Sequence, residues 1–282
     1  MKNLFKKLFV GFTVLSLTAC GSTTMQDNTF AAKENKGFTK YTNQLVVEYA
    51  ENDYTTMHQF FEHPEDYGID VNKVEVSLGE FYTDNTEEIK EDQKELNKFN
   101  RSTLDKAQQT IYDELKYENE LSLKTENKKF QYLNNCWSTM SGLHQSLVSV
   151  FSEYILRSEQ DIQDLITLIN DVPRYTNDVL EYTKEQANKN TLQFDYNSVI
   201  QDIQDVINNK EDSSITSALD NAIDALNLDE EKTTSYKAQV KDAMDISFFP
   251  SYQAMLDTLT SLQSKVQPLG QRRHALYTSL CG

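Results

Sequence analysis

The segment HQFFEHPEDYGID (58–70) concentrates two histidines and four carboxylates in a chain of 282 residues that has only four histidines. Histidine and carboxylate side chains are the usual protein ligands of zinc. Zinc helices of the H-E-x-x-H type place two histidines four residues apart, on one face. His58 and His63 are five residues apart and would point about 140° away from each other on a helix. The spacing therefore argues against a zinc helix.

A calcium loop is excluded by the order of the acids in the same segment. Asp66 and Asp70 do not follow the D-x-[DN]-x-[DN]-G pattern of such loops. Pro64 and Gly68 are typical of a helix end followed by a turn, with the nearby acids in solvent. We interpret the segment as structural and predict no metal ligands in this chain.

A second candidate for chemistry is Ser141, which lies three residues before His144. A serine nucleophile of the common hydrolase type sits in a G-x-S-x-G turn and needs an acid to orient its histidine. The turn context is absent here, and no orienting acid can be named from the sequence. We interpret Ser141 as a loop residue and His144 as a helix residue, and predict no catalytic residues.

The first twenty residues predict a lipid anchor. Three lysines precede an apolar stretch, Leu8–Leu17, which is too short to span a membrane but fits a signal peptide. The sequence Leu-Thr-Ala-Cys that ends at Cys20 resembles the lipobox of bacterial lipoproteins. The resemblance implies removal of residues 1–19 and attachment of a diacylglyceryl group, with further acyl chains such as palmitate, to Cys20. An ordinary signal peptide with a coincidental cysteine is the alternative. Residues 20–36 read as a flexible tether.

The charge excludes several classes of partner. Without residues 1–19 the chain keeps 24 of its 27 basic residues against 44 acidic ones, a net charge of −20. Such a body repels nucleic acid and anionic lipid heads, so we expect no nucleic-acid partner and a membrane link through the lipid alone. The expected location is extracytoplasmic, on the cell membrane. Two cysteines remain, Cys136 and Cys281, and we expect free thiols.

The folded part is predicted to be all-α, a bundle-like domain over residues 37–266. Apolar residues recur at helical spacing almost throughout, and glycine and proline are few. We expect one long first helix from Phe38 to Phe61, and a helix that ends at Pro173. Only segment 71–81 alternates apolar and polar residues, and this pattern indicates an extended connector or one short strand. Helix starts are indicated by three acid or serine caps: Asp84, Ser158 and Asp229.

Five segments are distinctive together: NDYTTMHQFFEHPEDYGI, VSLGEF, SGLHQSLVSVFSEYILRSEQDIQDLITLINDVPRY, IDALNLDEEKTTSYK and FPSYQAMLDTLTSL. In this order they resemble the N-terminal half of the family called domain of unknown function 885. The resemblance covers roughly Phe38 to Leu262. It implies a largely helical, often lipid-anchored protein related to zinc metallopeptidases of the thermolysin-like clan. It also implies that the region from Trp137 to Gln145 faces a substrate cleft. The cleft-facing candidates are Trp137, Ser141, Gly142 and His144.

The zinc motif of that family, of the H-E-x-x-P-G-H kind, has no counterpart here. The resemblance therefore places zinc only in a C-terminal half, and we expect this chain to hold no cofactor and to be inactive alone. Residues 267–282 form an atypical tail with Arg272 and Arg273, which suggests a frameshift or early stop; a natural short paralogue is the alternative. Two other functions stay open. They are a lipoprotein that binds peptides or cell-wall fragments, and a subunit of a split metallopeptidase.

The fragment interpretation makes a structural prediction. A helix that normally packs against a lost half should leave its apolar face uncovered. The residues expected on that face are Tyr252, Met255, Leu259 and Leu262.

Overall fold

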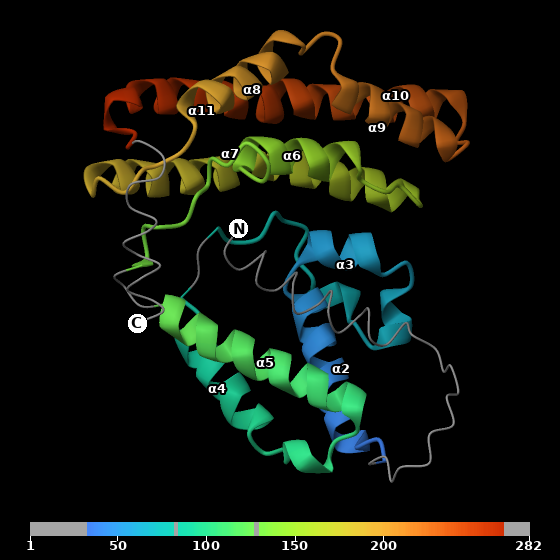
Figure 1. Cartoon of the computed structure of the whole chain (residues 1–282). Helices are drawn as coiled ribbons and strands as arrows, with labels where there is room; N and C mark the ends of the chain where they lie inside the picture. Colours follow the sequence, from blue (N-terminus) through green and yellow to red (C-terminus); the bar gives the residue numbers. More distant parts are fainter. Residues whose placement is uncertain (1–32, 82–83, 127–129, 268–282) are drawn as a thin grey trace. The chain divides into compact units, whose positions relative to one another are not determined.

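The computed structural model describes residues 33–81, 84–126 and 130–267, and those residues form helices and connecting loops without any strand (Figure 1). The predicted all-α class is confirmed. The chain divides into two compact units. The first lies within Met1–Glu75 and Glu80–Gln131, and the second within Val76–Gly79 and Tyr132–Gly282. The single helical domain expected over residues 37–266 thus comprises two units.

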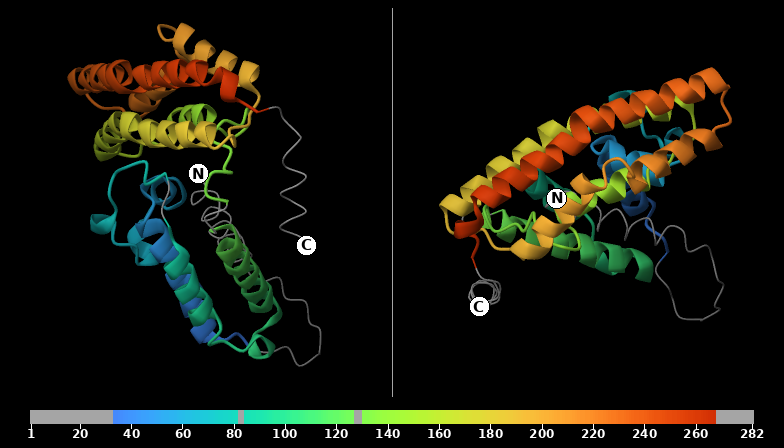
Figure 2. Two further views of the ribbon diagram at one scale, coloured as in Figure 1. Left: turned by 90° about the vertical axis from the view of Figure 1, so that its left-hand side faces the viewer. Right: turned by 90° about the horizontal axis from the view of Figure 1, so that it is seen from above.

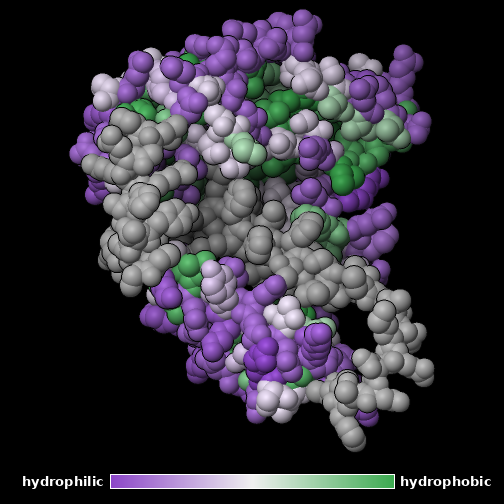
Figure 3. Space-filling model, in the orientation of Figure 1, coloured by the Kyte–Doolittle hydropathy of each residue, from purple (hydrophilic) through white to green (hydrophobic). Residues whose placement is uncertain are grey.

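The first unit is built on three long helices with a short helix and three 3₁₀ turns. These elements are α2 (Lys36–Glu51), α3 (Tyr54–Phe60), η1 (Pro64–Tyr67), η2 (Val71–Lys73), α4 (Thr86–Leu96), η3 (Arg101–Thr103) and α5 (Lys106–Thr125). An apolar cluster of α2, α4, α5 and the turn before α5 holds the unit together. Its buried members are Phe38, Leu96, Leu104, Tyr112 and Leu115. Hydrophilic side chains prevail on the visible surface of α4 and α5 (Figure 3).

The expected long first helix is wrong, because the chain breaks between α2 and α3. The side chain of Asp53 accepts a hydrogen bond from the backbone N–H of Thr56 at 3.0 Å and caps the new helix. An aspartate at this position satisfies a free amide of the first turn and competes with an uninterrupted helix. The turn predicted at Gly68 is confirmed: this glycine ends η1 at φ 79°, in the left-handed region.

The second unit consists of six helices and two short turns. They are α6 (Leu143–Ser152), α7 (Glu159–Asn188), α8 (Tyr196–Asn208), α9 (Ser214–Ala225), α10 (Glu230–Ala243), η5 (Met244–Phe248), α11 (Phe249–Ser261) and η6 (Gln263–Lys265). The elements α10, η5 and α11 follow one another as one rod, which runs beside α7 (Figures 1 and 2). Helix α8 packs against α11, and α9 packs against α6 and α10.

Two of the predicted helix starts are confirmed in this unit. Ser158 and Asp161 form a reciprocal capping box at the start of α7, and Asp229 caps α10 through the backbone N–H of Lys232. The predicted cap at Asp84 is one position too early, because Asn85 is the N-cap of α4. The side chain of Asp84 still accepts a hydrogen bond from the backbone N–H of Thr86 at 3.1 Å.

The helix end predicted at Pro173 is wrong, because α7 continues through it for fifteen further residues, to Asn188. A proline inside a helix removes one backbone hydrogen bond and costs about 3 kcal/mol. The buried stripe of α7 spans both sides of the proline, with Ile169 and Val172 before it and Tyr175 and Val179 after it. Tertiary packing of that stripe outweighs the local cost.

The rod contains a π-helical turn, η5, which ends two residues before Pro250. In an α-helix the ring of Pro250 would clash with the carbonyl group of residue 246 and would leave that group without a donor. The wider π turn changes the register over these residues and accommodates the proline. It also carries Ile246, which is 73% exposed.

The prediction of an uncovered apolar face on the last helix is wrong. Tyr252, Met255 and Leu259 of α11 are fully buried, and Leu262 is 8% exposed. The reason is that α8 and α7 of the same unit pack against α11. The stripe read from the sequence therefore belongs to the core of the second unit.

Candidate functional site

The two histidines of segment 58–70 lie in different environments. His58 is buried in α3, and its ring stacks on Tyr54 with 5.6 Å between ring centroids. The side chain of His63 is 65% exposed, and its Nδ1 lies 3.8 Å from the carboxylate of Glu65. Within residues 33–81, 84–126 and 130–267, no three His, Cys, Asp or Glu side chains are grouped so that they could hold a metal ion.

The loop that leads into α6 is fixed on the C-terminal half of α7. The indole Nε1 of Trp137 donates a hydrogen bond to Thr183 Oγ1 at 2.9 Å, inside the core. The amide of Gln186 donates to the carbonyl oxygens of Tyr132 and Asn134 at 3.0 Å and 2.7 Å. These polar side chains of α7 replace the regular backbone pairing that a loop lacks. They hold the cleft-facing candidates, residues 137–144, in one place.

His144 follows directly in the first turn of α6 and is 1% exposed. Its ring stacks on Trp137 with 6.2 Å between centroids, and its Nε2 lies 3.4 Å from Asp202 Oδ2. Neither ring nitrogen has a hydrogen-bond partner among the described residues. Burial lowers the pKa of His144, and the nearby carboxylate of Asp202 opposes that shift only in part.

The absence of a side chain at Gly142 leaves space for the imidazole ring of His144. A Cβ atom at position 142 would lie 2.5 Å from the carbonyl oxygen of Ser138 and 2.8 Å from Cε1 of His144. No side chain fits in that space, so only glycine permits the close approach of the turn to the imidazole.

The cleft-facing candidates are therefore packed inside this unit. Trp137, Gly142 and His144 are buried, and Ser141 is half-buried. A role in facing a substrate stays a prediction. The ring of His144 accepts no hydrogen bond from Ser141, so these two residues form no serine–histidine pair.

The described thiol is unreactive. Burial raises the pKa of Cys136 to about 12, which keeps the group protonated and poorly nucleophilic. The predicted lipid attachment at Cys20, the predicted free thiol at Cys281, and Arg272 and Arg273 of the tail lie outside the described residues. Among residues 33–81, 84–126 and 130–267, every helix is too short or too polar for a membrane span.

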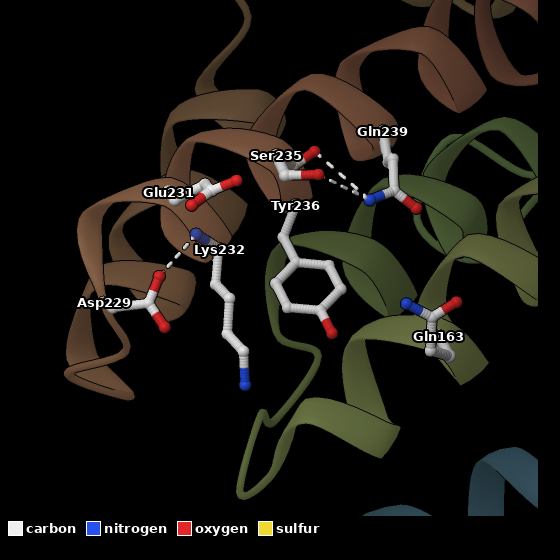
Figure 4. A pocket seen from close by; sticks show the side chains of 7 residues that line it. All are labelled: Gln163, Asp229, Glu231, Lys232, Ser235, Tyr236 and Gln239. Carbon is white, nitrogen blue, oxygen red and sulfur yellow. Dashed lines mark hydrogen bonds between the residues drawn. The ribbon is translucent and has the colours of Figure 1, made fainter.

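A surface pocket of about 480 Å³ opens between the N-terminal parts of α7 and α10 (Figure 4). At its edge, Glu159 accepts hydrogen bonds from Lys232 Nζ at 2.8 Å and from the phenol of Tyr236 at 2.9 Å. Lys232 pairs with Glu159, so a ligand would meet the carboxylates of Asp229 and Glu231 beside the amide and hydroxyl groups. The sequence showed only the cap Asp229, so this pocket was not predicted. It is lined by Gln163, Asp229, Glu231, Lys232, Ser235, Tyr236 and Gln239.

Comparisons with known proteins agree with the helical architecture. A protein family described as "Bacterial protein of unknown function (DUF885)" matches residues 67–280. The fold is similar to the crystal structure of the "putative lipoprotein from Colwellia psychrerythraea", with a TM-score of 0.57 and 14% sequence identity. The similarity covers 93% of this chain and 42% of that chain, so the chain spans less than half of that protein's length. No curated protein matches the sequence.

Proposed function

Because the chain belongs to the DUF885 family of bacterial proteins of unknown function, we propose that it is a lipid-anchored, extracytoplasmic helical protein without catalytic activity of its own. It would correspond to the non-catalytic N-terminal half of a zinc-metallopeptidase-related protein. The observation that carries the proposal is the span of the fold similarity, 93% of this chain against 42% of a protein described as a lipoprotein.

The lipid anchor is supported by the basic and apolar start of the chain and by the lipobox-like residues before Cys20. Several acyl chains on one cysteine give lasting attachment, at about 0.8 kcal/mol for each buried CH₂ group. Membrane fractionation of wild type and Cys20→Ala tests the anchor. The variant should leave the membrane fraction, and Cys136→Ala should stay in it. A Cys20→Ala protein that remains membrane-bound contradicts the anchor.

The lack of catalytic activity is supported by the sequence, in which no H-E-x-x-H or H-E-x-x-P-G-H motif occurs. A catalytic zinc needs about three protein ligands with an open position for water. Thermal unfolding with and without added zinc, together with a peptidase assay, tests this point. A ligand that binds the folded state raises the melting temperature. We expect no zinc-dependent rise and no hydrolysis; a saturable rise together with hydrolysis would refute the proposal.

A second candidate function is capture of a peptide or cell-wall fragment, and the polar pocket between α7 and α10 favours it. Its amide, hydroxyl and phenol groups suit a ligand that forms many hydrogen bonds. Native mass spectrometry with a soluble disaccharide-peptide from peptidoglycan is a direct test. Binding that Gln163→Ala weakens, and that Gln201→Ala on the exposed side of α8 leaves unchanged, would support it. Absence of any complex would reject it for this ligand.

A further inference from the structure

His144 is a buried polar group that the fold leaves unsatisfied. The residue is 1% exposed, and both of its ring nitrogens lack a hydrogen-bond partner among the described residues. Protein interiors satisfy nearly all such groups, because each unmade hydrogen bond costs about 1–3 kcal/mol. A buried neutral imidazole that makes no hydrogen bonds suggests a role for the protonated form of the ring.

A carboxylate lies close to this ring. Oδ2 of Asp202, on α8, lies 3.4 Å from His144 Nε2, at the outer limit of hydrogen-bond distance and not aligned as a full hydrogen bond, but close enough to attract a charge. The same oxygen accepts a hydrogen bond from the side chain of Gln145 at 3.0 Å. The side chain of Asp202 is 33% exposed, so it has room to move.

We propose that His144 is a proton-sensitive switch in the second unit: uptake of a proton draws Asp202 towards Nε2 and loosens the turn 138–142. The inference is independent of the proposed anchor and of the pocket.

The two nitrogens of a protonated ring have unequal surroundings. Nε2–H can reach Asp202 after a small movement of α8 and gain a charge-assisted hydrogen bond. Nδ1–H faces the turn at Gly142, where a Cβ atom would lie 2.9 Å from Nδ1 and 2.5 Å from the carbonyl oxygen of Ser138. That oxygen already accepts a hydrogen bond from the backbone N–H of Gly142 at 2.7 Å, and Nδ1 has no hydrogen-bond partner among the described residues. A second buried donor without a partner is costly, so the turn must move or admit water.

Asp202 carries the charge that acts on the ring; the titratable groups on the other neighbouring segments are neutral. Burial raises the pKa of Cys136 on the preceding loop to about 12, and burial also raises the pKa of Tyr252 on α11. The phenol of Tyr252 donates its hydrogen bond to the backbone oxygen of His144. A pH change between about 5 and 8 therefore acts here through His144.

The direction of the effect follows from the lowered pKa. Burial, opposed in part by Asp202, places the folded-state pKa of His144 below the ordinary value of 6.5. The unfolded chain then binds more protons than the folded chain in the window below 6.5. Stability contributed by the neutral ring is complete above 6.5 and is lost as the pH falls towards the lowered pKa.

Trp137 provides a readout, because it stacks on His144 and is the only tryptophan of the chain. The emission of the full-length protein in detergent is titrated from about pH 8 to about pH 5. We expect a reversible transition with its midpoint below 6.5, faster amide exchange in residues 138–142 at the acid end, and unchanged helix content. His58→Gln, in the other unit, is the control and should keep the transition.

Two variants decide the outcome. His144→Gln should abolish the transition, and Asp202→Asn should lower its midpoint by about one pH unit or more, because the carboxylate that favours the charged ring is removed. Asp202 is partly exposed, so its variant remains informative if His144→Gln does not fold. A flat emission profile, or a midpoint that Asp202→Asn leaves unchanged, would overturn the proposal.

Discussion

The carboxylate of Asp171 accepts a hydrogen bond from the backbone N–H of Leu78 at 2.8 Å, although the two residues are 93 positions apart in the chain. Arg174 completes the contact, since it pairs with Asp171 and donates to the carbonyl oxygen of Gly79 at 2.9 Å. One turn of α7 thus fixes segment Val76–Gly79. This segment belongs to the second unit, although the residues on both sides of it in the sequence belong to the first unit. We call this group of contacts the α7 clamp.

Asp171→Asn should destabilise the protein by about 1–3 kcal/mol, because the clamp loses its charge-assisted bonds to Arg174. The side chain of Asp171 is only 14% exposed, so water does not easily replace those bonds. Urea unfolding measures the change. Asp178→Asn is the matched control: Asp178 pairs with Arg174 at 3.3 Å, its side chain is 40% exposed, and its loss should cost little. Equal effects of the two variants would argue against the clamp.

The contribution of the clamp should depend on pH. Burial by itself would raise the pKa of Asp171, but hydrogen bonds from Arg174 and from the Leu78 N–H outweigh it and lower the pKa. A carboxyl with a lowered folded-state pKa stabilises above its unfolded value, here 3.8, and this stability is lost as the pH falls through the lowered pKa. The stability difference between wild type and Asp171→Asn should therefore shrink under acid. A difference that stays constant with pH would contradict this assignment.

Two buried threonines of α7 should respond oppositely to removal of their hydroxyl groups. Thr183 accepts a hydrogen bond from Trp137, so Thr183→Val leaves the buried indole N–H without an acceptor. The variant should lose about 1–3 kcal/mol of unfolding free energy. The hydroxyl of Thr176, two turns earlier, has no partner among the described residues. Thr176→Val should be neutral or stabilising by about 1 kcal/mol. Denaturation midpoints of both variants check the pair, and a loss at Thr176 as large as that at Thr183 would be inconsistent with these assignments.

The buried face of α11 should be costly to truncate. Leu259 is fully buried, so Leu259→Ala should lower the free energy of unfolding by about 2–5 kcal/mol. Ile246, which is 73% exposed in the π turn of the same rod, serves as the control. Ile246→Ala should change the free energy of unfolding by less than about 0.5 kcal/mol. If Leu259→Ala were as mild as the control, α11 would have to be uncovered in solution.

Local signals predicted much of this fold. The pairs that cap helices, such as Ser158 with Asp161, act within one turn, and the structure confirms them because nothing distant competes. The same local reasoning fails at Pro173, where packing of a long buried stripe outweighs the cost of the proline. It fails again at Asp53, whose capping side chain splits a pattern that looked continuous.

Contacts between distant segments could not be read from one sequence. The pattern at Tyr252 showed an apolar face but not whether α8 would cover it. Nothing near Asp202 indicated that it would meet His144, 58 residues earlier, because both lie on ordinary amphipathic helices. Trp137 and His144 were singled out as candidates, yet only the fold shows that they are enclosed together.

The most direct test of the central proposal is the intact mass of the protein extracted with detergent from its native membrane. We predict a chain that begins at Cys20 and carries a diacylglyceryl group on that cysteine, without residues 1–19. An unmodified Cys20, or a chain that retains residues 1–19, would contradict the assignment of a lipid-anchored extracytoplasmic protein.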